Sequence, residues 1–554
     1  MPNILTKEMV ARLRKTTDPD SVSNLLFSFT GFRLQNPAVI KQYHDLLLFY
    51  RAFPFDKKTE QVSKSELHRI AQAVKQITPT NSKKRIALMA SGIAHTELYC
   101  SYGQSIAQWL HQKFPSHVEF DSSEATMDTV RNTLQLLLPP VEFEKTTQGE
   151  YGLGKRIQLL SVKKNKAGLL SWLLNAFDES KLSLAIKEEL YRQLKIFICW
   201  TLTNEHFSRT FLSIPIIKIF YQKEFIKNPD AAAIIKQVLI KPLKLSTTEK
   251  TVLSDTMKAS LSLQYRETDP ISFADTNELE LFDMGRGLQI ALIGMIKEKR
   301  LSLESYIGFM AFKNGLPVSY GGGWLWGQRC KIGINIFAPF RRGESAWLFY
   351  QVLRLYYQHL GARHFVVNPY QFGKGNPDGL KSGAFWFYYK AGFRPVEENI
   401  KKAADKEWQK IQQDKNYRTP VTVLRLFTRC YTEWITDTKI PVTIPATRIS
   451  AAISSMIVHQ FKGSRKKALE VSNQLFMKHF LPDTRKNRMP FQQEVINNWS
   501  LLTLLMKNIN LWSRKEKEDL LHIMLLKQKG KERDYILQLQ KHNRFRRSLQ
   551  GVDQ

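Results

Sequence analysis

Residues 331–337 alternate strictly between two kinds of side chain, and this alternation constrains the fold more than any other feature. Isoleucine occupies every second position, so the isoleucines share one face of a strand. A helical pattern with an apolar stripe follows at residues 344–360, and residues 364–367 form a short apolar strand. This order predicts a β-α-β unit whose helix is entered through a basic turn.

The surrounding segment, residues 275–400, is expected to alternate between strands and helices. Asn314-Gly315 predicts a hairpin turn, because both residues tolerate positive φ. The other elements expected here are strands at 278–282, 306–313 and 316–320, an interruption at glycines 321–323, a continuing strand at 324–326, and helices at 286–297 and 384–390. The predicted fold class is therefore α/β (α+β), with largely helical N- and C-terminal regions around a mixed sheet.

The whole chain divides into four expected regions. They are a helical region at 1–80, a mixed α/β region of unknown role at 81–274, the core at 275–400, and a basic, mainly helical region at 401–554. Further elements expected outside the core are helices at 36–53, 105–114, 126–138 and 191–203, and strands at 85–90, 213–222 and 440–444.

Composition indicates a folded, cytoplasmic protein with a basic surface. Of its 554 residues 43% are hydrophobic, which is ample for a packed core. The four cysteines, at 100, 199, 330 and 430, form neither a C-x-x-C pair nor a zinc spacing, so a reducing compartment is expected and no metal. The start of the chain has no signal pattern, and no apolar run reaches the roughly 18 residues that cross a membrane.

The net charge of +32 is unevenly distributed. Residues 401–554 contain 30 Lys and Arg against 14 Asp and Glu, so half of the net charge lies in the last 154 residues. A basic surface attracts nucleic acids, anionic membranes and polyanionic cofactors. It also arises from solvated basic faces with no partner, so charge alone does not select a function.

The turn at residues 341–346, Arg-Arg-Gly-Glu-Ser-Ala, is suited to a phosphate group. A helix begins there, and its first N–H groups and partial positive charge favour an anion. Gly343 permits close backbone approach, and Arg341 and Arg342 add attraction and bidentate hydrogen bonds. The alternative is a plain strand-to-helix turn with solvated arginines.

The order of motifs around this turn resembles the GNAT superfamily of N-acetyltransferases. A hairpin, a strand, a phosphate-binding turn and a helix are followed by a strand and by Ala-x-x-x-Tyr-x-x-x-Gly-Phe, which here is Ala384, Tyr388, Gly392 and Phe393. The likeness covers about 90 residues. Phe340 stands where the superfamily usually has Arg or Gln in the turn. The resemblance implies a mixed sheet with two splayed parallel strands.

The resemblance also implies an activity, a co-substrate and site residues. The expected reaction is acyl transfer from acetyl-coenzyme A, or another acyl-coenzyme A, to an unidentified amine. Tyr388 is the implied general acid, and no general base is identified. The implied coenzyme-binding residues are Ile336, Phe337 and Ala338 for the pantetheine arm, and Arg341, Arg342, Gly343, Glu344, Ser345 and Ala346 for the pyrophosphate.

A second hypothesis stays open beside the enzyme. The chain would be a basic nucleic-acid-binding protein, or a scaffold, that keeps the fold without catalysis. Its contacts with phosphate would come from the basic clusters at 462–467 and 544–547 in the C-terminal region.

Overall fold

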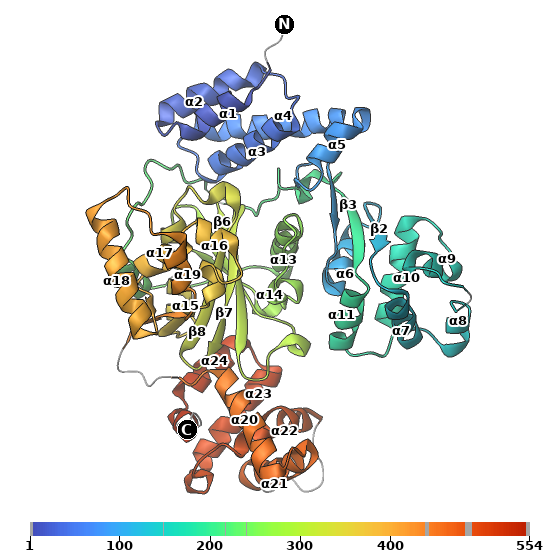
Figure 1. Cartoon of the computed structure of the whole chain (residues 1–554), viewed down its shortest axis with the longest axis vertical. Coiled ribbons are helices and arrows are strands. Elements are labelled where there is room, and N and C mark those ends of the chain that lie inside the picture. Colours follow the sequence, from blue (N-terminus) through green and yellow to red (C-terminus); the bar gives the residue numbers. More distant parts are fainter. Residues whose placement is uncertain are drawn as a thin grey trace.

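The computed structural model describes residues 4–147, 149–216, 218–239, 241–437, 443–481 and 490–549. An eight-stranded sheet lies at the centre (Figure 1). N-terminal helices lie at one end of it, C-terminal helices at the other, and a smaller three-stranded unit projects from its side. Within the described residues, no helix combines the length and apolar character needed to cross a bilayer.

The central sheet is mixed. Its strands follow the order β10-β11-β9-β8-β7-β6-β5-β4, and β8 and β9 are its parallel neighbours, whereas the other pairs are antiparallel. The strands are β4 (Glu280–Asp283), β5 (Leu288–Ile293), β6 (Ser305–Lys313), β7 (Leu316–Trp326), β8 (Arg329–Ile336), β9 (His364–Val367), β10 (Arg394–Pro395) and β11 (Thr432–Ile435). β11 lies beyond residue 400, so the sheet extends past the segment expected as the core.

Helices cover both faces of this sheet. α15 (Ser345–Gln358) packs on one face, where the Tyr356 hydroxyl donates to the Ile307 carbonyl at 2.6 Å. α13 (Thr247–Ser262) and α14 (Asp269–Ser272) lie on the other face (Figure 1). The remaining helices around the sheet are α12 (Ala231–Lys236), α16 (Pro377–Lys381), α17 (Ala384–Lys390), α18 (Glu398–Gln413) and α19 (Val421–Phe427).

The parallel strands β8 and β9 pair only at their beginnings. Arg329 to Lys331 on β8 are matched to His364 to Val366 on β9, and β8 then continues to Ile336. Among the described residues, this further stretch of β8 pairs with β7 alone. Its outer edge is therefore available to groups other than a β-strand.

Glycines 321–323 do not interrupt β7, contrary to the sequence-based expectation. The strand runs through them, and neighbouring groups approach its backbone there too closely for a side chain. A Cβ on Gly321 would lie 2.1 Å from the Gly333 carbonyl oxygen, and one on Gly323 would lie 2.5 Å from the Tyr356 ring. The glycines are thus a packing requirement of the sheet rather than a break in it.

We expect Gly321→Ala to lower the free energy of unfolding by roughly 1–3 kcal/mol, because backbone must move to admit the methyl group. Gly31→Ala is the matched control, since nothing lies within 4 Å of a Cβ there. Urea unfolding of both variants measures the difference. Equal stability of the two would contradict the packing explanation.

Three other sequence-based assignments were wrong. The segment expected as a helix at 286–297 contains β5, whose side chains are buried on both faces of the sheet, so its sequence is apolar at every position except Gln289 and lacks the alternation of a half-buried strand. The expected helix at 191–203 contains the buried strand β3 (Ile196–Thr201), for the same reason. The expected strand at 85–90 lies mostly in α5 (Ser82–Leu88), whose cap Asn81 accepts from the Lys84 N–H at 3.0 Å.

Of the remaining assignments, two were right, one more was wrong, and one lies largely outside the described residues. The helix at 36–53 is α3 (Pro37–Ala52), and Asn314 and Gly315 turn the hairpin with φ of 46° and 82°. Residues 213–222 were expected as a strand, but those of them that the structure describes form no regular strand. The expected strand at 440–444 lies largely outside the described residues.

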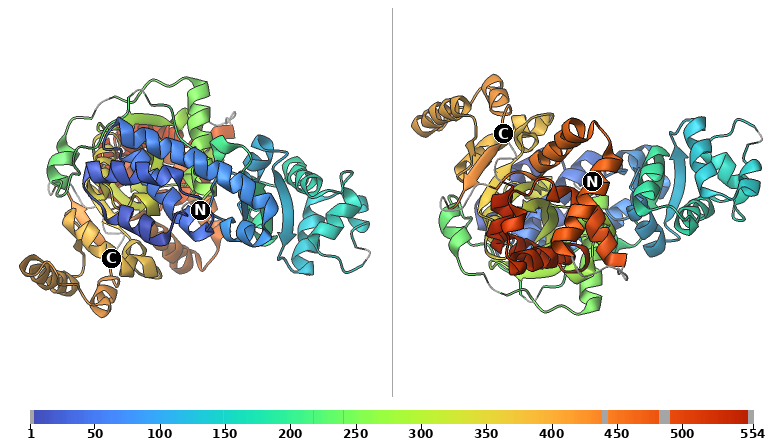
Figure 2. Two further views of the ribbon diagram at one scale, coloured as in Figure 1. Left: turned by 90° about the horizontal axis from the view of Figure 1, so that it is seen from above. Right: turned by 90° about the horizontal axis from the view of Figure 1, so that it is seen from below.

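The N-terminal helices cover one end of the sheet, as the view from above in Figure 2 shows. They are α1 (Lys7–Lys15), α2 (Pro19–Ser28), α3, α4 (Lys57–Thr80) and α5. The side unit has the strand order β1-β3-β2 and a separate apolar core. Its elements are β1 (Glu97–Cys100), α6 (Gln104–Lys113), β2 (Val118–Ser123), α7 (Met127–Leu137), α8 (Pro140–Glu144), α9 (Leu153–Leu160), α10 (Lys166–Glu179), α11 (Leu184–Gln193) and β3.

The C-terminal helices are joined to the sheet by a buried ion network. Lys527 donates to Glu532 at 2.9 Å, and both side chains are 2% exposed. Arg300, just before β6, lies 3.6 Å from Glu532 and 2.9 Å from Glu278. The C-terminal helices are α20 (Ala446–Phe461), α21 (Arg465–Phe480), α22 (Pro490–Thr503), α23 (Arg514–Lys529), α24 (Glu532–Lys541) and α25 (Asn543–Ser548).

Candidate functional site

The expected phosphate-binding turn connects β8 to α15 through a short 3-10 helix, Ala338–Phe340. Gly343 is closely packed in this turn. A Cβ on it would lie 2.4 Å from the Phe53 ring, which comes from the residue after α3. An N-terminal helix thus covers the glycine, and this side of the turn is not open to a phosphate group.

Glu344, the N-cap residue of α15, points into the protein. Its carboxylate accepts from Arg286 at 2.7 Å and lies 3.3 Å from the Lys313 Nζ. The Gln222 amide and the Ile226 N–H donate to it as well, each at 3.0 Å. A buried, fully partnered carboxylate therefore stands beside the N-terminus of α15.

Charge and burial act in opposite directions in this cluster. Burial raises the pKa of Glu344, but Lys313, the Ile226 N–H and Arg286 together bring that pKa below its usual value. Burial lowers the pKa of Lys313 to about 8. The Lys313 ammonium also lies over the rings of Phe53 and Phe220, at 5.0 and 5.1 Å from their centroids. These contacts hold the turn in place from within.

The two arginines of the turn lie on its exposed side. Arg341 donates through Nε to the Ile336 carbonyl at 3.1 Å. Arg342 donates to the Arg14 carbonyl at the end of α1, and its guanidinium lies 5.9 Å from the centroid of the Phe49 ring. The turn thus separates its exposed cations from its buried Glu344.

The other residues expected to bind coenzyme are spread along the same turn. Ile336 ends β8 half-buried, and Ala338 is exposed. Phe337 is buried, its N–H donates to the Val318 carbonyl at 3.0 Å, and its ring packs on Tyr320. Ser345 and Ala346 are half-buried in the first turn of α15. These residues therefore follow one another along the turn, but their side chains do not face a single cavity.

A cavity of about 270 Å³ lies on the exposed side of the turn. The side chains around it come from α1, α3 and the turn itself, and they are Lys7, Val10, Ala11, Arg14, Gln42, Asp45, Leu46, Phe49, Ala338, Pro339 and Arg342. Two of the expected coenzyme-binding residues, Ala338 and Arg342, are among them.

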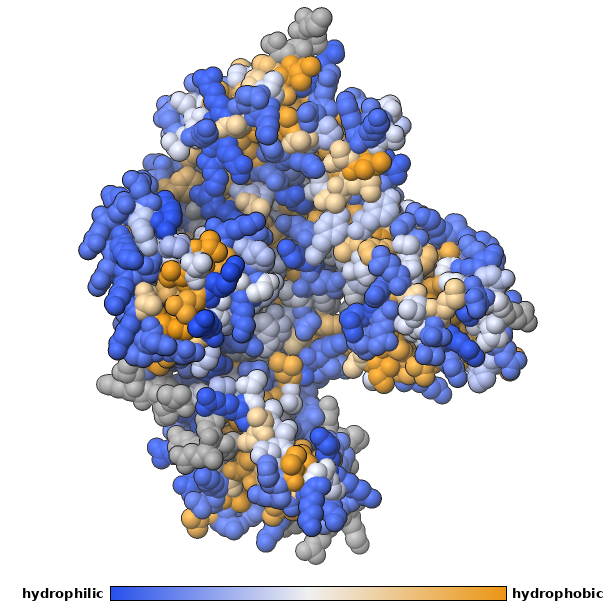
Figure 3. Space-filling model, viewed as in Figure 1, coloured by the Kyte–Doolittle hydropathy of each residue, from blue (hydrophilic) through white to orange (hydrophobic). Residues whose placement is uncertain are grey.

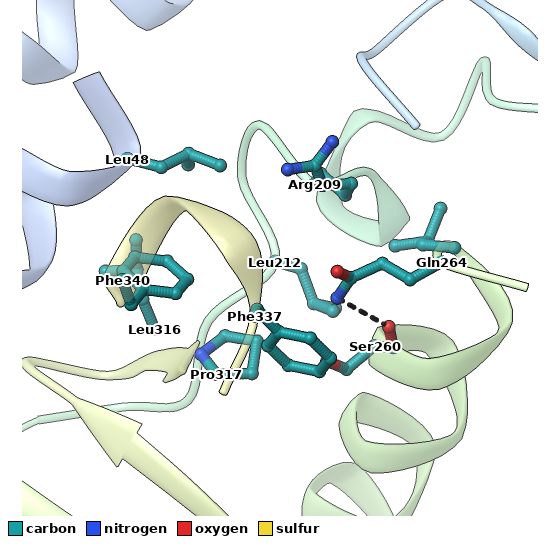
Figure 4. Close-up of a pocket in the computed structure, with 10 residues that line it drawn as sticks. Leu48, Arg209, Leu212, Ser260, Gln264, Leu316, Pro317, Phe337 and Phe340 are labelled. Carbon is teal, nitrogen blue, oxygen red and sulfur yellow. Dashed lines mark hydrogen bonds between the residues drawn. The ribbon is translucent and has the colours of Figure 1, made fainter. Parts of the chain in front are cut away.

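A second, smaller cavity of about 20 Å³ lies below the end of β8 (Figure 4). Phe337, Phe340, Arg209 and Gln264 are among the residues around it, and Gln264 donates to the Ser260 carbonyl at 3.2 Å. Its volume corresponds to about one water molecule. It lies between the end of the strand and α13, and it is too small for a larger ligand.

Tyr388, the expected general acid, lies on α17 at the edge of β8. Its ring packs edge-on against Phe349 of α15, and its hydroxyl is 3.4 Å from the Gln371 Oε1. Burial raises the pKa of Tyr388, whereas a hydrogen bond from the backbone of Ile334 lowers it. Ile334 belongs to the stretch of β8 that has no β9 partner. The hydroxyl therefore meets β8 just beyond the point where the two parallel strands stop pairing.

Gln371 and Tyr389 complete this region. The Gln371 amide lies against Gly333, where a Cβ would be 2.7 Å from Nε2, so its side chain fills the space beside β8. The Tyr389 hydroxyl donates instead to Asp405 of α18. Of the two adjacent tyrosines, only Tyr388 reaches the strand.

Sequence reasoning missed Lys7, Arg14 and Gln371. The two cations are spaced by seven residues on one helix, which is a signal that α1 has a basic face, but nothing in that spacing indicates that it faces the turn. Gln371 follows β9 by four residues, in a short 3-10 helix (Pro369–Phe372) whose sequence contains no recognisable motif.

Comparison with protein-family models, with curated proteins and with solved structures finds no match for this chain.

Proposed function

We propose that the chain is an acyl-coenzyme A-dependent N-acyltransferase that transfers an acetyl group to an amine. The observation that carries the proposal is the position of Tyr388, whose hydroxyl donates to Gln371 at 3.4 Å beside the part of β8 that β9 does not pair with. An acid placed beside a strand edge that no other strand covers suits a thioester that lies along that edge after the Gln371 side chain moves. The order of motifs in residues 307–396 supports the same reaction.

The reaction requires a proton donor for the thiolate that leaves. The amine attacks the acyl carbon, a C–N bond forms, and the C–S bond of the thioester breaks. Tyr388 then gives its phenolic proton to the thiolate, while the amine loses its proton to water. Burial favours the neutral phenol, so Tyr388 holds its proton at neutral pH and gives it up only to the strongly basic thiolate as the C–S bond breaks.

The strand edge supplies the second requirement, which is stabilisation of the oxyanion. Beyond Lys331, backbone groups of β8 that point away from β7 face the gap beside β9. A backbone N–H directed at the developing oxyanion stabilises the transition state in a water-poor site. Gln371 now fills part of the gap, and its flexible side chain is the group that the pantetheine arm would displace.

Binding of acetyl-coenzyme A to the full chain tests the proposal. We expect calorimetry to detect a complex with a dissociation constant in the micromolar to low millimolar range, because most enzymes bind substrates in roughly that range. Gln371→Ala should bind at least as tightly, since it removes the side chain from the gap. No heat of binding for either protein at millimolar coenzyme would overturn the proposed function.

A further inference from the structure

The 270 Å³ cavity beside the turn is enclosed by two matched helical faces. α1 contributes Lys7, Val10, Ala11 and Arg14, and α3 contributes Gln42, Asp45, Leu46 and Phe49. Both sets follow the spacing i, i+3, i+4, i+7, which places four side chains in one stripe along a helix. The cavity therefore runs along both helices, and Ala338, Pro339 and Arg342 close one side of it.

The charges around this cavity are mostly positive. Lys7, Arg14 and Arg342 line it, and among the described residues none of the three forms an ion pair. Each of them is exposed, as expected for long cationic side chains whose charged ends reach into water. Three cations that converge without a carboxylate partner favour an anionic ligand.

Asp45, the acidic residue in the cavity wall, does not neutralise them. Arg209 donates to its carboxylate at 2.7 Å, from outside the residues that line this cavity. Burial raises the pKa of Asp45, but the His44 ring and Arg209 outweigh burial and bring that pKa below its usual value. Asp45 is thus charged and already partnered, and the three cations remain available.

We propose that this cavity binds the phosphate groups of coenzyme A, an assignment that rests on the proposed function, and that helix α1 supplies two of the three cations. The N-terminus of α15 is closed by Phe53 and has Glu344 beside it, whereas Arg342 lies one residue before the closed Gly343. The phosphates therefore bind outside the turn rather than in it.

Removing one cation at a time tests this assignment in the full chain. Arg14→Gln and Lys7→Gln should each weaken acetyl-coenzyme A binding about 10-fold, which is the effect of losing one charge-assisted contact with phosphate. Arg12→Gln is the matched control, because Arg12 lies on the same helix and is exposed but does not line the cavity. Acetyl-pantetheine, which has no pyrophosphate, should bind all four proteins equally.

Calorimetry with inorganic pyrophosphate separates this inference from the proposed function. If Arg14→Gln and Lys7→Gln bind the coenzyme as tightly as the wild-type chain, the cavity assignment is wrong and the acyltransferase proposal stands. Pyrophosphate binding that depends on Arg14, without coenzyme binding, would support an anion site and overturn the acyltransferase. If neither probe binds the wild-type chain at millimolar concentration, both proposals are wrong.

Discussion

Replacing Tyr388 by phenylalanine is expected to lower the rate of acyl transfer by about 10²- to 10⁴-fold, the range typical for the loss of a general acid. The variant keeps the ring that packs against Phe349 and loses only the hydroxyl beside Ile334 and Gln371. Acetyl-coenzyme A binding should therefore persist. Release of free thiol from acetyl-coenzyme A, measured with an amine selected from a panel of acceptors, gives the rate.

Tyr389→Phe is the matched control for this experiment. It removes the same atom from the adjacent residue, but the Tyr389 hydroxyl contacts Asp405 and not the strand. We expect it to turn over at nearly the wild-type rate. A selective loss in Tyr388→Phe places the proton donor at the edge of β8. Equal rates for the two variants would contradict the role of Tyr388, whereas equal losses would indicate damage to the packing of α17.

The helix that carries Tyr388 was predictable because the residues that determine it are close in the sequence. The alternation at 331–337 and the stripe of the following helix are local patterns, and β8, α15 and β9 follow them closely. α17 begins and ends at the residues expected for it, 384 and 390. Elements of this kind depend on neighbours within a few residues, so the sequence alone indicates them.

The closure of the turn was not predictable, because it depends on residues far away in the chain. Phe53 lies 290 positions before Gly343, and Gln222 and Arg286 reach Glu344 from two other segments. The six residues of the turn, 341–346, give no information about such distant partners. The error in β5 has a related cause, since helices and other segments that cover both faces of the sheet remove the alternation by which a strand is recognised.

The surface charge is likewise a poor guide by itself. The face of the molecule in Figure 3 is largely hydrophilic over both the N-terminal and C-terminal helices, so polar side chains do not mark one region. What distinguishes Lys7, Arg14 and Arg342 is their convergence on one cavity, and that convergence requires the fold. Part of the excess positive charge in the C-terminal region stabilises the fold instead, because Lys527 is buried in an ion pair.

Lys527→Met is expected to lower the free energy of unfolding by about 3–5 kcal/mol, because it leaves a buried carboxylate without its closest cationic partner. The Lys527 Nζ donates to Glu532 at 2.9 Å and to the Glu304 carbonyl at 2.9 Å. Arg300, the remaining cation, is shared between Glu532 and Glu278. Burial raises the pKa of Glu278 to about 7, so the ionised form of this carboxylate is already disfavoured in the network.

Two further variants distinguish the loss of the ion pair from the loss of a lysine. Lys515→Met removes an exposed lysine from the same helix and should change the free energy of unfolding by less than about 0.5 kcal/mol. Lys527→Met combined with Glu532→Gln removes both charges, so most of the stability should return. Urea unfolding, followed by tryptophan fluorescence, to which the buried Trp499 and Trp512 of the C-terminal region contribute, measures these changes in stability. If Lys527→Met unfolds at the same urea concentration as Lys515→Met, the network does not hold the C-terminal helices to the sheet. A double variant no more stable than Lys527→Met would indicate that packing of the lysine stem, rather than its charge, joins the two parts.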